Sequence, residues 1–303
     1  MASLRLRLIN LLSRGILRRV AARVSGPDRA RIELERATSI FLRPPSQTTI
    51  RKDGALSWIS CGCVEASPVI LYFHGGGYIA GSPETHRAML GRLSKLTGIQ
   101  VVAPAYRLAP EHPAPAGFED ACAAFAELRA RGYAPSQIVL GGDSAGGGLA
   151  LALLAHLCAR DARPAGLFAF SPWTDLTMSG ASVTSNAAAD RLLPAERIGE
   201  LLDFVAPPEI RADARVSPLF ARFERPPPVL MQVAENEILF DDTRRMAEHL
   251  RRSGGQVEVQ TQPDAPHVWQ LLDGYVPEAR ESLGNVAAFI GSLIPRSRSE
   301  DGS

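Results

Sequence analysis

The chain has 303 residues, of which 46% are hydrophobic and 21% charged, as is typical of a soluble globular protein with a sizeable core. Its 33 basic and 32 acidic side chains give a net charge of +1, so no overall field favours nucleic acid as a partner. The sequence contains no apolar run of roughly eighteen residues, which argues against a transmembrane segment. The length suits one large α/β domain, with or without a small cap, or two ordinary domains.

The N-terminal segment is basic and amphipathic. Residues 3–24 contain six arginines and no acidic residue. An apolar stripe recurs there at helical spacing: Leu4, Leu8, Leu11, Leu12, Ile16 and Leu17. Such a helix is typical of a transit peptide, of a membrane-surface binder, or of a cap that rests its apolar face over an active site. We favour the cap; a secretory signal is not expected, because the segment lacks a continuous apolar region and a small-residue cleavage site.

Short apolar runs alternate with helical segments along most of the chain. A hairpin within residues 50–60 is expected to turn at Asp53 and Gly54. Strands are expected at residues 69–73, 100–103, 138–140, 166–170, 229–233 and 257–261, and helices at residues 85–96, 116–131, 146–160, 241–252 and 276–293. Because these strands are apolar on both faces, they predict an α/β fold with a mostly parallel sheet covered by helices on both sides.

Two stretches do not follow this alternation: residues 1–45, which end at a pair of prolines, and residues 176–214, with a helix expected near 194–205. A long excursion between neighbouring strands is usually functional, and open α/β sheets bind ligands at the carboxyl ends of their strands. We therefore expect these two stretches to form a helical cap over a main domain of residues 46–175 and 215–295. The polar residues 296–303 are expected to be disordered.

The four cysteines form no recognisable metal-binding pattern. Cys61 and Cys63 are too close for the usual Cys-x-x-Cys motif, and Cys122 and Cys158 are isolated in helix-like stretches. Reduced thiols in a cytoplasmic protein are therefore expected.

The most informative motif is Gly-Gly-Asp-Ser-Ala-Gly-Gly at residues 141–147, between a predicted strand and a predicted helix. Gly142, Ser144 and Gly146 fit a nucleophile elbow, a sharp turn in which larger flanking side chains would clash. Such a turn lifts the serine Oγ clear of the sheet and aims the free amides of the helix N-terminus at a reacting carbonyl. A plain glycine-rich turn is the alternative that this motif alone leaves open.

A second glycine motif, His-Gly-Gly-Gly-Tyr at residues 74–78, follows the predicted strand at 69–73. Consecutive glycines allow backbone amides to approach a ligand closely, as stabilisation of an oxyanion requires. His74 is expected to hold this loop in place. A phosphate-binding loop is disfavoured, because neither of the common phosphate-binding glycine motifs occurs in its expected setting.

Four motifs together resemble those of the hormone-sensitive-lipase-like bacterial carboxylesterases, which are α/β-hydrolases. They are, in order, HGGGY at 74–78, YRLAPEH at 106–112, GDSAGG at 142–147 and SPWTD at 171–175. The resemblance extends from about residue 69 to 290 and more weakly into an N-terminal cap. It implies hydrolysis of short- to medium-chain acyl esters without a metal or organic cofactor, and it suggests a homodimer.

The chain order serine, acid, histidine selects the remaining catalytic candidates. The family places its base where His267 lies, before the C-terminal helix; His249 is expected to be solvated on a charged helix. The family's usual Asp-Pro-Leu-x-Asp-Glu motif is replaced by Glu-Ile-Leu-Phe-Asp-Asp at residues 237–242, which puts Glu237 at the acid position. A glutamate can orient the imidazole and stabilise the imidazolium. The alternatives are Glu235, Asp241 and Asp242.

The resemblance also suggests supporting roles. The expected oxyanion donors are the amides of Gly76, Gly77 and Ala145. The residues expected to brace the elbow and the glycine loop are His74, Gly75, Tyr106, Arg107 and Asp143. Trp173 and Asp175 are expected to support the acid and the cap, and Trp269 either packs in the core or lines the pocket.

The sequence also leaves alternatives open. The expected partner is a small-molecule ester, with weak membrane-surface contact through residues 1–24 as a further possibility. A non-catalytic receptor on the same fold is one rival, although plant gibberellin receptors, which resemble this family, lack the catalytic histidine that this chain keeps. Hydrolysis of lactones, carbamates or amides by the same residues is the other rival.

Overall fold

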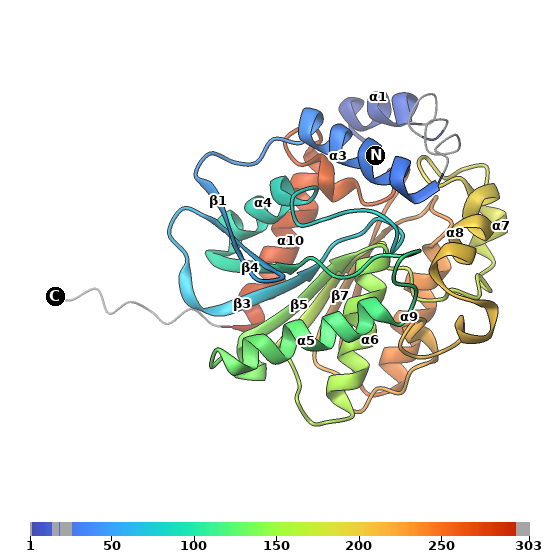
Figure 1. The fold of residues 1–303 in the computed structure, drawn as a ribbon. Helices are drawn as coiled ribbons and strands as arrows, with labels where there is room; N and C mark the ends of the chain where they lie inside the picture. Colours follow the sequence, from blue (N-terminus) through green and yellow to red (C-terminus); the bar gives the residue numbers. More distant parts are fainter. Residues whose placement is uncertain (1, 14–17, 19–25, 295–303) are drawn as a thin grey trace.

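The computed structural model describes residues 2–13, 18 and 26–294, and its centre is an eight-stranded sheet (Figure 1). The strands are β1 (Thr48–Asp53), β2 (Leu56–Cys61), β3 (Glu65–Phe73), β4 (Ile99–Pro104), β5 (Ile138–Asp143), β6 (Gly166–Phe170), β7 (Val229–Ala234) and β8 (Val257–Gln262). Their order is β1-β2-β4-β3-β5-β6-β7-β8. β2 runs antiparallel to β1 and β4, and all other neighbours are parallel. The predicted α/β class is confirmed.

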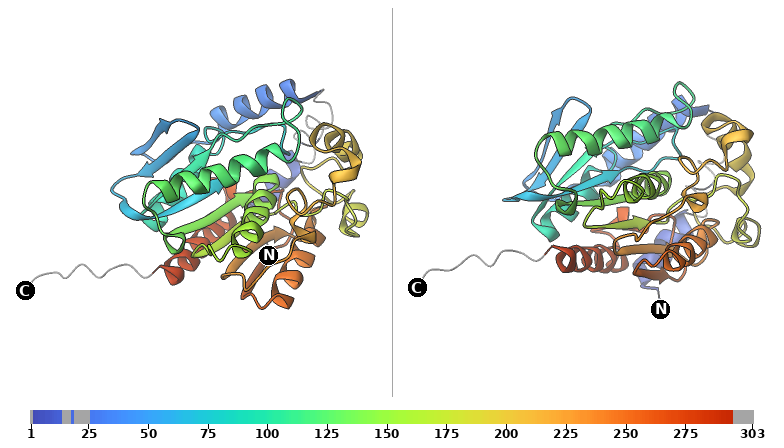
Figure 2. Two further views of the ribbon diagram at one scale, coloured as in Figure 1. Left: turned by 60° about the horizontal axis from the view of Figure 1, so that its bottom comes forward. Right: turned by 90° about the horizontal axis from the view of Figure 1, so that it is seen from below.

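Helices cover both faces of the sheet (Figures 1 and 2). α4 (Arg87–Thr97) and α10 (Pro277–Leu293) pack on one face, against side chains such as Ile70 and Tyr72 of β3. α5 (Ala116–Ala130), α6 (Ala145–Cys158) and α9 (Phe240–Arg252) pack on the other, against Leu71 and Phe73 of the same strand. Successive residues of a strand point to opposite faces, so an uninterrupted apolar run such as that of β3 requires cover on both sides.

The remaining helices lie outside these two layers. They are α1 (Leu4–Leu12), α3 (Gly26–Phe41), α7 (Ser182–Ser185) and α8 (Ile198–Val205). Short 3-10 turns connect other segments: η2 (Pro135–Gln137), η3 (Ala195–Arg197), η4 (Pro208–Ile210), η5 (Pro218–Phe220) and η6 (Trp269–Leu272). α3 and α8 border one pocket together with the loops that follow β3 and β5. The two stretches that interrupt the alternation therefore meet at one end of the sheet.

The predicted strands and core helices agree with the observed ones to within a few residues. The hairpin turn differs slightly: Asp53 still pairs with Leu56, so the turn comprises Gly54 and Ala55. His249 is half-buried rather than solvated, because its ring packs edge-on against Phe223 and its Nε2 lies 2.7 Å from the Ala221 carbonyl oxygen.

The N-terminal helix is turned differently from the expectation. Its inward face carries Leu6 and Asn10, both buried, whereas the leucine stripe predicted to rest over the site faces solvent. Residues 14–17 and 19–24 of the predicted helix, with Ile16 and Leu17, lie outside the described residues, as does the 296–303 tail. Within the described chain, no helix has both the length and the apolar content needed to cross a bilayer.

Candidate active site

Ser144 sits at a backbone turn between β5 and α6 that few residues other than glycine adopt. Its φ is 53° and its ψ is −123°, and its amide donates to the Phe170 carbonyl at 2.8 Å. A Cβ on Gly146 would lie 2.1 Å from the Phe73 carbonyl oxygen, and one on Gly142 would lie 2.4 Å from the carbonyl of Gly146. The flanking glycines are therefore required because backbone occupies the space that a side chain would need.

The carboxylate of Asp143, next to Ser144, ties the elbow to the glycine loop. Its Oδ1 accepts bonds from the Gly75 amide at 2.9 Å and the Tyr72 hydroxyl at 2.8 Å. His86 Nε2 lies 3.2 Å from the same carboxylate. Burial disfavours both charges, but their mutual attraction prevails, so the pKa of His86 is raised and that of Asp143 is lowered. An ionised Asp143 is thus favoured.

The glycine loop is held by its own backbone and by two rings. The side chain of His74 stacks on Tyr106 at 4.3 Å between centroids, and the Tyr106 hydroxyl donates to the His74 carbonyl at 2.7 Å. Burial lowers the pKa of His74 to about 4, so this ring stays neutral. Within the described chain, the amides of Gly76 and Gly77 donate to no acceptor. These two amides are therefore free to bind a ligand oxygen.

His267 and Glu237 form a buried pair. His267 Nδ1 lies 2.5 Å from Glu237 Oε2, and Glu237 Oε1 accepts from the Ser171 hydroxyl at 2.7 Å and the Ala234 amide at 2.8 Å. Burial would lower the pKa of His267, but the neighbouring glutamate raises it above its ordinary value. His267 Nε2 is buried and has no hydrogen-bond partner among the described residues. It is the ring nitrogen left available for a proton from elsewhere.

The other acid candidates are engaged away from His267. Glu235 accepts from the Thr261 hydroxyl at 3.0 Å. Asp241 accepts from the Ser182 amide at 3.0 Å and pairs with Arg244, also at 3.0 Å. Asp242 accepts from the Thr174 and Asp175 amides at 2.7 and 2.9 Å. Of the four candidates, Glu237 is the one that contacts the histidine.

One pocket of about 420 Å³ brings these groups together. Its wall includes Ser144, His267 and the three glycines at 75–77, and Trp173 lies beside them. The segments α3 and 176–214 add apolar residues to the wall, including Ala30, Leu34, Leu192, Leu193, Leu201 and Phe204, and the charged residues Glu33, Arg197 and Glu200. Such a site suits a substrate with one polar reacting group and an apolar remainder. Within the described residues, no cluster of His, Cys, Asp or Glu side chains could hold a metal ion.

Known proteins share this architecture. A family model described as the alpha/beta hydrolase fold matches residues 70–271. An esterase of Acinetobacter venetianus is 35% identical over 230 residues, 75% of this chain and 76% of that protein. A crystal structure titled as an esterase from the bacterial hormone-sensitive lipase family aligns with a TM-score of 0.91 and 33% identity, covering 97% of this chain and 99% of that one. The chain belongs to this α/β-hydrolase family.

A further relative of this α/β-hydrolase is the carboxylesterase/phospholipase LipF of Mycobacterium tuberculosis. It is 34% identical over 286 residues, which cover 90% of this chain and 73% of LipF. This match extends over most of the chain, beyond the 70–271 region of the family model.

The supporting residues of the α/β-hydrolase lie in different places. The Trp173 amide donates to the Ser144 carbonyl at 2.9 Å, directly behind the elbow. Arg107, expected to brace the elbow, instead bonds Asp120 at 3.0 Å and Glu119 at 2.9 Å, because its side chain extends toward α5. Trp269 packs in a small core cluster with Leu6 and is not part of the pocket wall.

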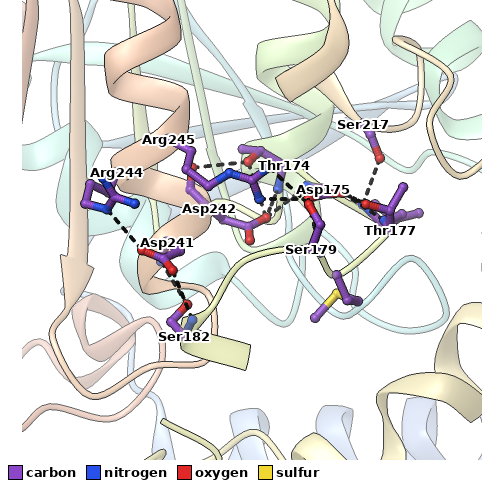
Figure 3. Close-up of polar contacts among 12 residues, drawn as sticks. Thr174, Asp175, Thr177, Ser179, Ser182, Ser217, Asp241, Asp242, Arg244 and Arg245 are labelled. Atoms are coloured by element: carbon purple, nitrogen blue, oxygen red, sulfur yellow. Dashed lines mark hydrogen bonds and ion pairs between the residues drawn. The ribbon is translucent and has the colours of Figure 1, made fainter. Parts of the chain in front are cut away.

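Figure 3 shows a polar network that joins the 171–179 loop to α9. Asp175 is fully buried and accepts from Arg245 at 2.9 Å and from the Ser179 hydroxyl at 2.6 Å. Asp242 lies beside it, and burial raises the pKa of Asp242 to about 7. The network fixes the start of α9, the helix that follows the Glu237 loop.

Residues 235–239, between β7 and α9, form the loop that carries Glu237, here called the acid loop. Residues of the 176–214 segment hold this loop in the α/β-hydrolase, and the sequence did not reveal these supporting residues. Asp190 is fully buried and accepts from the Ile238 amide at 2.9 Å, and Asn186 donates to the Glu237 carbonyl at 2.8 Å. Asn236 forms two hydrogen bonds with the backbone of Ala265, at 3.0 and 3.1 Å. It so links the acid loop to residues 263–268, the loop that carries His267 and is here called the base loop. No motif or spacing marks these residues, because each acts on a segment far away in the sequence.

The base loop has supports of its own. Arg191 pairs with the Asp264 carboxylate at 2.5 Å, and Asn10 of α1 donates to the Asp264 carbonyl. The loop that carries His267 is therefore held at Asp264 by the 176–214 segment and by the N-terminal helix.

Proposed function

We propose that this chain hydrolyses short- to medium-chain acyl esters through an acyl-enzyme formed on Ser144. At the coarser level the chain is a carboxylic ester hydrolase, in keeping with relatives named esterase, acetyl-hydrolase and carboxylesterase. The observation that carries the serine mechanism is the shared pocket: Ser144 on its strained turn, His267 paired with buried Glu237, and the free amides of the glycine loop line one cavity.

In the first step of this mechanism, Ser144 Oγ attacks the ester carbonyl carbon while His267 Nε2 takes the hydroxyl proton. The π electron pair moves to the carbonyl oxygen, and the amides of Gly76, Gly77 and Ala145 bind the resulting oxyanion. Loss of one such donor typically costs about 3 kcal/mol of transition-state stabilisation. Glu237 holds the imidazole in the tautomer with its proton on Nδ1 and stabilises the imidazolium.

In the second step the imidazolium returns its proton to the leaving alkoxide as the carbon–oxygen bond breaks, which leaves the acyl group on Ser144. Water then attacks the acyl carbon, gives a proton to His267, and the acid departs as Ser144 is protonated again. The ester and one water molecule supply every atom of the alcohol and acid products, and the two steps need no oxidant or reductant.

We assign the proposed chain-length preference to a cap made of residues 1–45 and 176–214. α3 and α8 contribute apolar side chains to the pocket, and Arg31 of α3 donates to the carbonyls of Ile79 at 2.8 Å and Ala109 at 2.9 Å. These bonds join α3 to the segment after the glycine loop and to the segment after β4. A pocket of about 420 Å³ bounded in this way supports acyl groups of modest length.

The finer expectations on partners and location belong to the same proposal. They are a homodimer, cytoplasmic placement and a weak contact of residues 1–24 with a membrane surface. Within the described part of these residues, α1 contributes nothing to the pocket wall, so the last expectation does not enter the chemistry.

The deciding experiment is hydrolysis of the p-nitrophenyl esters of acetate, butyrate and decanoate by the wild-type chain and Ser144→Ala. We expect turnover of acetate and butyrate, weaker turnover of decanoate, and loss of nearly all activity in the variant. Turnover that survives in Ser144→Ala would refute the serine mechanism. Binding of these esters without turnover by the wild-type chain would favour the receptor, and turnover of lactones, carbamates or amides alone would favour the second rival.

A further inference from the structure

Helix α1 has two faces of opposite character. Its inward face is fastened to the protein: Leu6 is fully buried, and the Ser3 amide donates to Glu278 at 2.6 Å. Its outward face presents four leucines to solvent. Their exposed fractions are 82% for Leu4, 60% for Leu8, 71% for Leu11 and 49% for Leu12. A soluble surface rarely presents so many large apolar side chains on a helix of this length.

The charged side chains carried by α1 itself are all basic. At about 100° per residue the four leucines fall within an arc of roughly 100°, with Arg5 at one border and Arg7 at the other. Both arginines are exposed. The first acidic residue of the whole chain is Asp28, so the helix has no carboxylate to pair with them. Glu278, which contacts the start of α1, is buried and already bonded to Ser3.

The apolar face continues beyond α1. Leu4 and Tyr275 line one shallow cavity of about 320 Å³, together with Arg5 and Arg280. The Tyr275 hydroxyl donates to the carbonyl of Phe41, at the end of α3, whose side chain is 60% exposed. Leu4 and Tyr275 thus lie next to two arginines. We call the surface formed by Leu4, Leu8, Leu11, Leu12 and Tyr275 the α1 face.

We propose that the α1 face docks on the surface of a membrane rich in anionic phospholipid. Leucines on the outward arc enter the boundary between headgroups and acyl chains, and arginines at both borders reach the lipid phosphates. A second copy of this chain is a poorer occupant, because a two-fold contact would bring the arginines of both helices together without an acid between them. Anionic lipid supplies the charge that the α1 face lacks.

This docking would place a lipid surface beside the active site without blocking it. The inward face of α1 packs on the base loop, through Asn10 to the Asp264 carbonyl and through Leu6 to Ala265 and Trp269. The pocket wall itself draws on α3 and α8 and on no residue of α1. Docking of the α1 face would therefore determine whether the protein works at a membrane surface, and it does not require the serine mechanism.

The test is sedimentation of the full-length protein with vesicles of phosphatidylcholine, alone or with about one third phosphatidylglycerol. We expect pelleting with the anionic vesicles only, weakened as NaCl rises from about 0.1 to 0.5 M. The double variant Leu8→Ser/Leu11→Ser should bind about tenfold more weakly. Arg5→Gln should bind about fivefold more weakly, since one arginine near an anionic surface contributes about that factor.

The matched control is Leu96→Ser, because Leu96 is also a partly exposed leucine (39%) but lies on α4. Its vesicle binding should equal that of the wild type. Thermal melting and turnover of water-soluble p-nitrophenyl acetate verify that every variant is folded, and Arg5→Gln carries the test if the double leucine variant does not fold. The proposal is wrong if the wild type does not pellet, if the double variant pellets as the wild type does, or if light scattering shows a dimer that only the leucine variant dissolves.

Discussion

The two halves of the candidate active site are built on different principles. The nucleophile half comprises the glycine loop and the elbow around Ser144. Backbone segments pack so closely there that several positions have room only for glycine. The acid–base half, Glu237 and His267, is held by hydrogen bonds between segments far apart in the sequence: Asp190 accepts from the Ile238 amide, Asn236 donates to the Ala265 carbonyl, and Asn10 donates to the Asp264 carbonyl.

This difference predicts two modes of failure. A substitution at Gly76, Gly142 or Gly146 in the nucleophile half should fail by collision, with the fold itself at risk, because the atoms that a Cβ would meet there belong to the backbone. A substitution in the acid–base half should loosen the geometry and leave the fold intact, because each loop has several anchors.

Gly146→Ala should abolish activity and prevent stable folding. The new Cβ would lie 2.1 Å from the Phe73 carbonyl oxygen and 2.4 Å from that of His74, both backbone atoms of the central strand and its loop. The measurement is yield of soluble protein, circular dichroism and turnover. Gly284→Ala is the control, because a Cβ there meets nothing within 4 Å, so helix α10 should gain stability by up to about 1 kcal/mol. A folded and active Gly146→Ala protein would contradict the collision account.

Glu237→Gln should lower kcat about 10³- to 10⁴-fold while the melting temperature changes little. The amide can no longer stabilise the imidazolium, and it can favour the wrong tautomer of His267. The matched variant is Asp241→Asn, whose carboxylate contacts Ser182 and Arg244 instead of the histidine. It should keep nearly full activity. If Asp241→Asn were the crippling change, the acid assignment would be wrong.

Asp242→Asn should make the protein more stable than the wild type, by a margin that grows as pH rises from about 4 to 7. Burial raises the pKa of Asp242 to about 7, from 3.8 in the unfolded chain, so over this range the folded state retains a proton that the unfolded state releases. The Asp242 carboxyl therefore destabilises the folded state more as pH rises, by up to about 4 kcal/mol for a shift of this size. Urea unfolding at several pH values measures the margin. A constant margin would show that Asp242 titrates normally.

Asp190→Asn should lower kcat by about tenfold with little change in KM, since weakened alignment of a catalytic pair has this order of effect. An amide cannot accept all three bonds that the Asp190 carboxylate takes from the amides of Leu192, Leu193 and Ile238. Asp203→Asn is the control in the same segment, because Asp203 is 76% exposed and pairs with Arg211 at the surface. Equal activity in both variants would mean that the 176–214 segment does not position Glu237.

The acidic limb of the pH profile of kcat/KM should have its midpoint above 6.5, the ordinary value for histidine. Burial opposes protonation of His267, but Glu237 raises its pKa, and the mechanism needs the ring neutral. Activity should therefore fall as pH decreases through this raised pKa. In Glu237→Gln the residual activity should show the limb at lower pH. A limb at or below 6.5 in the wild type would contradict the pairing.

The fold class and the nucleophile half could be read from the sequence because their information is local. An apolar strand followed by glycines, and a serine between glycines before a helix, each state a backbone requirement within a few residues. Motif order then identified His267 and Glu237 as candidates, although their roles remain predictions. The order of the catalytic residues excluded His86 as the base, but its bond to Asp143 could not be predicted because His86 lies outside the four motifs.

Local patterns of residues were enough to show which strands are covered on both faces and where the chain turns so tightly that glycine is required. How the loops around Glu237 and His267 are held, and which face of α1 is exposed, depend on the packing of segments far apart in the chain. The helical period reveals an apolar stripe but not its partner: Leu6 and Asn10 found complementary contacts on the base-loop side, so the leucine stripe was left outward. Contacts between segments far apart in the chain depend on how whole layers pack, and no local pattern records that.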